Sequence, residues 1–159
     1  MRNWTRRVCA SALCILCLLA LFPVRAAAAG AIDTSRNVRL TIEYRHDGKP
    51  VASVPFELYY VASVDTYANF TLAGNFTAYP VTLENLTAAE WTALAETLAA
   101  YAERDNLTPL DSGKTDASGS LTFPNETDRL APGLYLAVGK KHTAGGYTYT
   151  TEPFLVSLP

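Results

Sequence analysis

Short stretches of alternating apolar and polar residues predict β-strands near the start of the folded part of this chain. Residues 38–44 alternate strictly (Val-Arg-Leu-Thr-Ile-Glu-Tyr), which is typical of a strand with one buried face. Residues 47–50 (Asp-Gly-Lys-Pro) predict a turn. Residues 54–62 place Phe56, Leu58 and Tyr60 two positions apart and therefore predict a second strand.

Six further strands are expected downstream, most of them bounded by turn residues. They lie at residues 67–72, 76–83, 120–123, 134–138, 147–151 and 154–158. Gly74 and Asn75 join the first two, while residues 115–119, residues 130–133 and the pair Gly145-Gly146 are turns before later ones.

One α-helix is predicted at about residues 87–104. Thr87 and Glu90 have the spacing of a capping box, in which each side chain binds a backbone N–H of the first helical turn. An apolar stripe follows at spacings of three and four, formed by Trp91, Leu94, Leu98 and Tyr101. We expect this stripe to pack on the edge of the β-structure; the alternative is a surface that binds a partner.

The order of these elements predicts a mainly β fold. Seven or eight short strands separated by turns are typical of a β-sandwich, and a single helix inserted between strands does not make a βαβ fold. We therefore expect residues 30–159 to form one β-sandwich domain, a length sufficient for a hydrophobic core.

The first 29 residues have the pattern of a secretory signal peptide. Three arginines (Arg2, Arg6 and Arg7) precede an apolar run over residues 8–21. Pro23 ends that run, and small residues predict cleavage near Ala28–Gly30. The run is short for a membrane span, although an uncleaved N-terminal anchor is the alternative. The mature chain is therefore expected to be secreted, with no membrane association after cleavage.

Removal of this leader changes the composition. All three cysteines (Cys9, Cys14 and Cys17) lie within it, so no disulfide is expected in the mature protein. Nine basic and fifteen acidic residues remain, for a net charge of −6. An acidic surface argues against nucleic acid or an anionic membrane as the partner.

Several motifs, taken in order, resemble those of a known family. They are Gly48-Lys49-Pro50-Val51 before Phe56-Glu57-Leu58-Tyr59, then Thr115-Asp116 with Gly119 and Phe123, and then Leu130-Ala131-Pro132-Gly133-Leu134-Tyr135-Leu136. This order resembles the prealbumin-like B-type domain of Gram-positive surface proteins. The capped helix and the closing residues 151–159 are similar to the N-terminal domain of Gram-positive pilin subunits.

The resemblance implies an immunoglobulin-like or prealbumin-like β-sandwich that serves as a building block or adhesin on the cell surface. Its partners would be other pilin or surface-protein subunits, or host and extracellular ligands. Family members are joined by sortases through a lysine in a pilin motif and a C-terminal sorting signal. Neither occurs before Pro159, so we expect either a fragment of a longer subunit, which a sortase would process, or a secreted relative held by noncovalent contacts.

Many such domains also form an internal Lys–Asn isopeptide bond promoted by a buried acid, and this sequence departs from that pattern. Arg39 and Arg45 stand where a lysine is needed, and an arginine does not serve as an amine nucleophile. Alignment of residues 130–135 places Gly139 at the position of the acid, and residues 154–158 contain no asparagine. No isopeptide bond is therefore predicted.

Residues suited to catalysis or metal binding are sparse. His46 and His142 are expected to be solvated loop residues without a nucleophile beside them. Asp111 and Asp116 flank Gly113 in one predicted loop, which leaves calcium binding as an alternative. We predict that the protein is not an enzyme and that it has no catalytic residue, cofactor or metal site.

Aromatic residues offer a candidate binding surface. Tyr147 and Tyr149 lie on one face of a predicted strand and are suited to stacking on sugars or peptides. Tyr59 and Tyr60 are expected on opposite faces of theirs. The leading hypothesis is an extracellular structural or adhesive module of a pilin-like surface protein. The alternative is a secreted carbohydrate- or peptide-binding module that does not polymerise.

Overall fold

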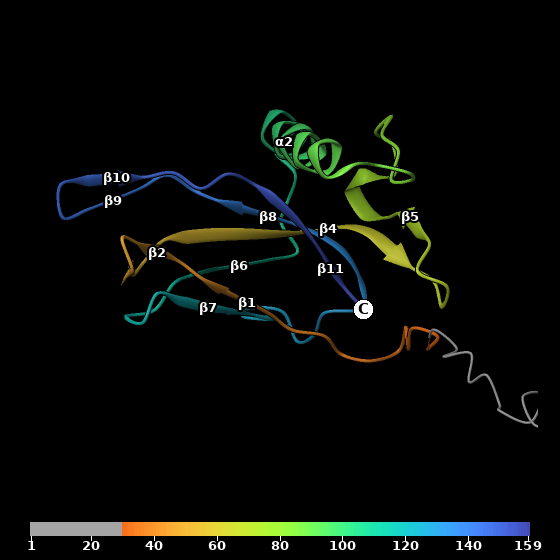
Figure 1. Ribbon diagram of the computed structural model, residues 1–159, viewed down its shortest axis with the longest axis horizontal. Helices are drawn as coiled ribbons and strands as arrows, with labels where there is room; N and C mark the ends of the chain where they lie inside the picture. Colours follow the sequence, from red (N-terminus) through yellow and green to blue (C-terminus); the bar gives the residue numbers. More distant parts are fainter. Residues whose placement is uncertain (1–29) are drawn as a thin grey trace, which may run out of the picture. The chain divides into compact units, whose positions relative to one another are not determined.

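The alternating stretches form antiparallel β-structure around one long helix in the computed structural model, which describes residues 30–159 (Figure 1). Its strands are β1 (Leu40–Glu43), β2 (Arg45–His46), β3 (Lys49–Pro50), β4 (Pro55–Val64), β5 (Phe70–Leu72), β6 (Asp111–Lys114), β7 (Ser120–Phe123), β8 (Gly133–Gly139), β9 (His142–Ala144), β10 (Tyr147–Tyr149) and β11 (Phe154–Leu158). Its helices are the short 3-10 helix η1 (Gly74–Phe76) and α2 (Ala88–Arg104). The predicted signal peptide lies outside the described residues. Within them, no helix has the length and apolar character needed to cross a membrane.

A five-stranded antiparallel sheet forms the centre of the fold. Its order is β11-β8-β4-β5, and β6 pairs with the other part of the same β4 edge that β5 uses. β4 is ten residues long and buried on both faces. Successive side chains of β4 alternate between the two faces, which places Tyr59 in one hydrophobic cluster and Tyr60 against the other, so the predicted opposite orientation of these two tyrosines is confirmed.

One face of this sheet is covered by the β1–β7 pair. Leu40 to Glu43 pair with Phe123 to Ser120 in strict antiparallel register. Ile42, Leu121 and Phe123 then pack with β4 and β8 residues in a cluster of buried side chains. In Figure 1 this pair lies on the opposite side of the central sheet from α2.

Helix α2 covers the other face of the sheet. The predicted capping box is present: Thr87 Oγ1 accepts from the Glu90 N–H at 3.4 Å, and the Glu90 carboxylate accepts from the Thr87 N–H at 2.7 Å. Ala95, Leu98 and Ala102 are buried against β4, β8 and η1, while Trp91, Leu94 and Tyr101 pack around them half-buried. The helix therefore covers a sheet face, and the expectation that it packs on an edge was wrong. The reason is that β8 and β11 present Leu134, Leu136 and Leu155 on that side.

Most predicted strands are present with small changes in their bounds, but residues 76–83 do not form one. Gly74 has a φ of +55°, and the chain turns into η1 through hydrogen bonds from Phe76 N–H to the Ala73 carbonyl and from Tyr79 N–H to the Phe76 carbonyl. Phe76 is 1% exposed and lies against Tyr59. Local turns that bury this ring replace the predicted ladder.

The predicted strand at residues 67–72 is shortened to β5. The Asp65 carboxylate accepts hydrogen bonds from the backbone N–H groups of Tyr67 and Asn69 at 2.8 and 2.9 Å, which folds residues 65–69 into a turn. Tyr67 at the tip is 84% exposed.

Eleven strands are present among residues 30–159, against about seven or eight expected. The additional ones are the short pieces β2, β3 and β9, together with β6, which occupies residues predicted to be a loop. β2 and β3 pair with each other and β9 pairs with β10 in local hairpins, whereas β6 pairs with the distant β4.

A small polar cluster closes the C-terminal end of α2. Arg104 donates to both carboxylate oxygens of Asp105, at 2.8 and 2.7 Å, and the Tyr79 hydroxyl donates to Asp105 Oδ2 at 2.5 Å. Tyr79 also stacks on Tyr101 at 4.5 Å between ring centroids. The hydrogen bonds from Arg104 and then from Tyr79 lower the pKa of Asp105 to about 2.

This cluster predicts a small acid-dependent loss of stability. Because the pKa of Asp105 in the folded chain is depressed, its contribution is complete above the unfolded pKa of about 3.9 and is lost as the pH falls toward 2. The denaturation midpoint of D105N should therefore lie below that of the wild type at pH 7, and the two should converge near pH 2. E103Q removes an exposed carboxylate from the same helix and should show no such convergence. A gap between D105N and wild type that persists at pH 2 would contradict the assignment.

Candidate functional site: an aromatic groove between two hairpins

Two short hairpins extend from the same end of the β-structure (Figure 1). β2 and β3 are joined through Asp47 and Gly48, with φ of +49° and +75°, and β9 and β10 are joined through Gly145 and Gly146, with φ of +59° and +83°. Positive φ at both central residues is the requirement of a two-residue type I′ hairpin turn. The Asp-Gly and Gly-Gly pairs therefore define both hairpins locally.

The side chains of these hairpins form an aromatic cluster centred on Tyr149. Its ring lies 5.5 Å from His46, 6.3 Å from His142 and 6.3 Å from Tyr44, measured between centroids. Tyr149 is half-buried and packs against the hydrophobic cluster that includes Ile42 and Phe56, so its position is fixed by the fold. Edge-to-face and stacked ring contacts at these separations are favourable.

Tyr147 forms the exposed part of the cluster. It is 64% exposed, with its ring 6.2 Å from His46 and 6.5 Å from Tyr149. A groove of about 420 Å³ runs between the two hairpins. Its lining consists of His46, Asp47, Lys49, Pro50, Val51, Ala52, Ala144, Gly145, Tyr147 and Tyr149. The groove thus combines aromatic faces with an acid and an amine at its rim, which suits stacking together with hydrogen bonding.

The structure brings Tyr147 and Tyr149 together, and it adds two residues that sequence analysis placed elsewhere. His46 and His142 were expected in solvated loops, but they lie on β2 and β9 beside Tyr149. His142 faces Tyr149 because these residues are paired in the β9–β10 register. His46 reaches the cluster from a hairpin about a hundred residues earlier in the sequence, so no local pattern indicated it.

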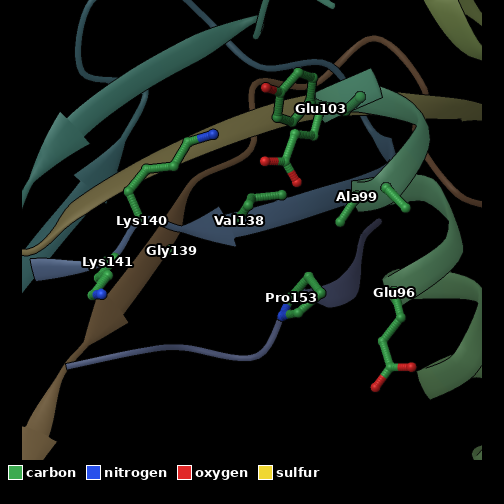
Figure 2. Close-up of a pocket in the computed structure, with 11 residues that line it drawn as sticks. Glu96, Ala99, Glu103, Val138, Gly139, Lys140, Lys141 and Pro153 are labelled. Atoms are coloured by element: carbon green, nitrogen blue, oxygen red, sulfur yellow. The ribbon is translucent and has the colours of Figure 1, made fainter. Parts of the chain in front are cut away.

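A second depression, of about 390 Å³, lies between α2 and the end of β8 (Figure 2). Figure 2 shows Glu96 and Glu103 on the helix side, and Lys140 and Lys141 on the strand side. The Lys140 amine is 2.7 Å from the Glu57 carboxylate, which also accepts a hydrogen bond from Tyr59 at 2.6 Å. Burial and this carboxylate raise the pKa of Tyr59. The Lys140 amine is therefore engaged in an ion pair across the sheet surface.

The aspartates proposed as alternative calcium ligands have separate structural roles. Asp111 begins β6 and is 3% exposed, with its carboxylate accepting backbone N–H groups of Ser112, Asn125 and Glu126 at 2.7–2.9 Å. Asp116 accepts from Ser118 and Ser120 within its own exposed turn. No group of three residues suited to holding a metal ion occurs within residues 30–159.

The positions relevant to isopeptide chemistry are occupied by two arginines and a closely packed glycine. Arg39 is exposed, and the Arg45 guanidinium lies 3.6 Å from the Glu43 carboxylate. Gly139 is packed so closely that an added Cβ would lie 2.6 Å from Thr151 Cβ and 3.0 Å from Phe56. The aligned acid position therefore has no room for a carboxylate side chain unless Thr151 and Phe56 move.

No family model, curated protein or solved structure matches this chain.

Proposed function

We propose that this chain is an extracellular, non-enzymatic structural or adhesive module of a pilin-like surface protein, and that the aromatic groove between the two hairpins is its contact site. The observation that carries the proposal is the convergence of His46, Tyr147 and Tyr149 from distant parts of the chain into one open groove. A groove of this kind binds by stacking and hydrogen bonding.

The arrangement of strands supports the finer part of the proposed fold, a prealbumin-like β-sandwich. The β1–β7 pair lies against the β11-β8-β4 sheet and shares one hydrophobic cluster with it. Asp111, at the start of β6, then binds the segment that follows β7. Two β-layers that enclose one core are the basis of a sandwich.

Substitution of the groove tyrosines tests the contact site. The probes are a printed glycan array and a printed peptide array, and the readout is retained fluorescence of the labelled protein. Tyr147→Ala should weaken binding to any spot that the wild type binds by about 5-fold, because one stacked aromatic ring contributes about 1 kcal/mol. Tyr149→Ala should weaken it further, since this ring also positions His46 and Tyr147.

Tyr67→Ala is the matched control for these variants. Tyr67 is also highly exposed, but it follows the other end of β4, away from the hairpins. Its removal should leave array binding unchanged. If Tyr147→Ala binds the arrays as strongly as the wild type and its circular dichroism spectrum is unchanged, the groove is not the contact site.

The second candidate function is a free carbohydrate- or peptide-binding module that does not polymerise. The aromatic groove supports it as well, because such a groove can bind a ligand without any assembly of subunits. A denaturing gel of cell-wall and medium fractions, probed with an antibody against this chain, separates the two. A ladder of very large, detergent-resistant species indicates assembly into a covalent structure. A single band near the mature mass in the medium indicates a free module.

A further inference from the structure

Strand β11 leaves one side of the central sheet open. It pairs with β8 over its whole length, from Phe154 opposite Ala137 to Leu158 opposite Gly133, and with no other strand among residues 30–159. In an antiparallel sheet, alternate backbone N–H and C=O groups of such a strand point away from the sheet. These groups form a template for one more strand.

The composition of β11 does not protect this edge. Soluble proteins usually block an edge strand with a charge, an internal proline or a bulge. β11 has the sequence Phe-Leu-Val-Ser-Leu, with an unbroken register to β8. The opposite edge of the sheet is better protected. It is divided between β5, with three residues, and β6, with four, and β6 carries the charged residues Asp111 and Lys114.

Apolar side chains flank the open edge on both faces of the sheet. On the helix side, Trp91 and Leu155 border a depression of about 330 Å³, whose lining also includes Pro153, Phe154 and, as polar members, Thr92 and Glu152. On the other side, Phe154 and Val156 are half-buried against the core shared with β1 and β7. An added strand would therefore gain backbone hydrogen bonds and apolar contacts at once.

We propose that this edge pairs with β11 of a second copy of the chain, antiparallel and about a two-fold axis through Val156. This register places Val156 opposite Val156 of the other copy. Phe154 of each copy then faces Leu158 of the other, and Leu155 faces Ser157. No charged side chain faces another within the pair, so the strand is complementary to itself. The same axis keeps α2 of both copies on one face of the joined sheet, which brings the two Trp91 depressions to the joint.

The magnitude and salt dependence of this association follow from its size and charge. A pair of five-residue strands buries less than the roughly 1,200 Å² of a stable interface, so we expect a dissociation constant on the order of 100 µM. Residues 30–159 carry a net charge of −6, and the two copies therefore repel each other. Added salt screens this repulsion and should strengthen the dimer, whereas it would weaken one held by ion pairs.

Sedimentation equilibrium tests the proposal on protein purified after expression of the full sequence. The weight-average mass should rise from monomer toward dimer between about 10 µM and 1 mM. Ser157→Lys places a lysine from each copy at the joint and should raise the dissociation constant at least about 10-fold. Thr148→Lys makes the same change at an exposed position of β10 and should leave it unchanged.

Hydrogen exchange on the wild type gives a readout that needs no variant. Alternate amides of β11 should gain protection as the protein concentration rises, while those of β5 and β6 should not. A mass that stays monomeric to about 1 mM overturns the proposal. So does a dimer that Ser157→Lys leaves intact, or protection that appears only at the hairpins, which would instead assign self-association to the aromatic groove.

Discussion

Replacing Asp111 with alanine is expected to lower the free energy of unfolding by about 2–4 kcal/mol. The Asp111 carboxylate is buried and accepts three backbone N–H groups, from Ser112, Asn125 and Glu126. Alanine leaves these donors without their acceptor in a region that is partly closed to water. Hydrogen bonds to a charged group are stronger than neutral ones, and an unpaired buried donor adds its own desolvation cost. Urea denaturation of the variant and the wild type measures the difference.

Asp116→Ala is the matched control, because it also removes an aspartate that caps backbone N–H groups. Asp116 lies in an exposed turn, where water replaces the lost acceptor. Its loss should therefore lower the free energy of unfolding much less than the loss of the Asp111 carboxylate does. Asp111→Asn keeps the shape of the side chain but turns an amide N–H₂ toward a backbone donor, and should fall between the two. Equal losses for Asp111→Ala and Asp116→Ala would show that burial is not the source of the effect.

The parts of the fold that sequence analysis predicted well are those determined by neighbouring residues. The capping box of Thr87 and Glu90 is complete within one helical turn, and it places the start of α2 correctly. Strand β7 alternates polar and apolar residues, and strands β8 and β11 are short, mostly apolar runs; the bounds of all three differ little from those predicted. In these segments the local pattern and the tertiary packing favour the same structure.

One error was local, since the turn made by Asp65 shortens the predicted strand at residues 67–72. The others occurred where distant residues decide the conformation. The apolar residues 76–83 suggested a strand, but burial of Phe76 against Tyr59 favours turns there. Asp111 appeared to lie in a loop because its three donors are its neighbour Ser112 and two residues of the segment after β7. In the aromatic groove, Tyr147 and Tyr149 were predicted because they share a strand. His46 was not, because it meets them only through the packing of two hairpins.

Truncation of Leu98 to alanine is expected to lower the free energy of unfolding by about 2–5 kcal/mol. Leu98 is fully buried at the centre of the interface between α2 and the sheet, in one cluster with Phe76, Leu134 and Leu136. Alanine is at least as favourable as leucine within a helix, so the loss reports lost packing and a cavity rather than lost helicity. Urea denaturation again provides the measurement.

Leu94→Ala, on the same helix but at a half-buried position, should lower the free energy of unfolding by less than about 1.5 kcal/mol. Equal losses would mean that Leu98 does not anchor the helix.

The two variants with the largest expected effects, Leu98→Ala and Asp111→Ala, should differ in their effect on the proposed dimer. Loosening α2 displaces Trp91 from the β11 edge, so Leu98→Ala should weaken the proposed dimer under conditions where the chain remains folded. Asp111 lies across the sheet on β6, and Asp111→Ala should leave the dimer unchanged because it does not contact that edge.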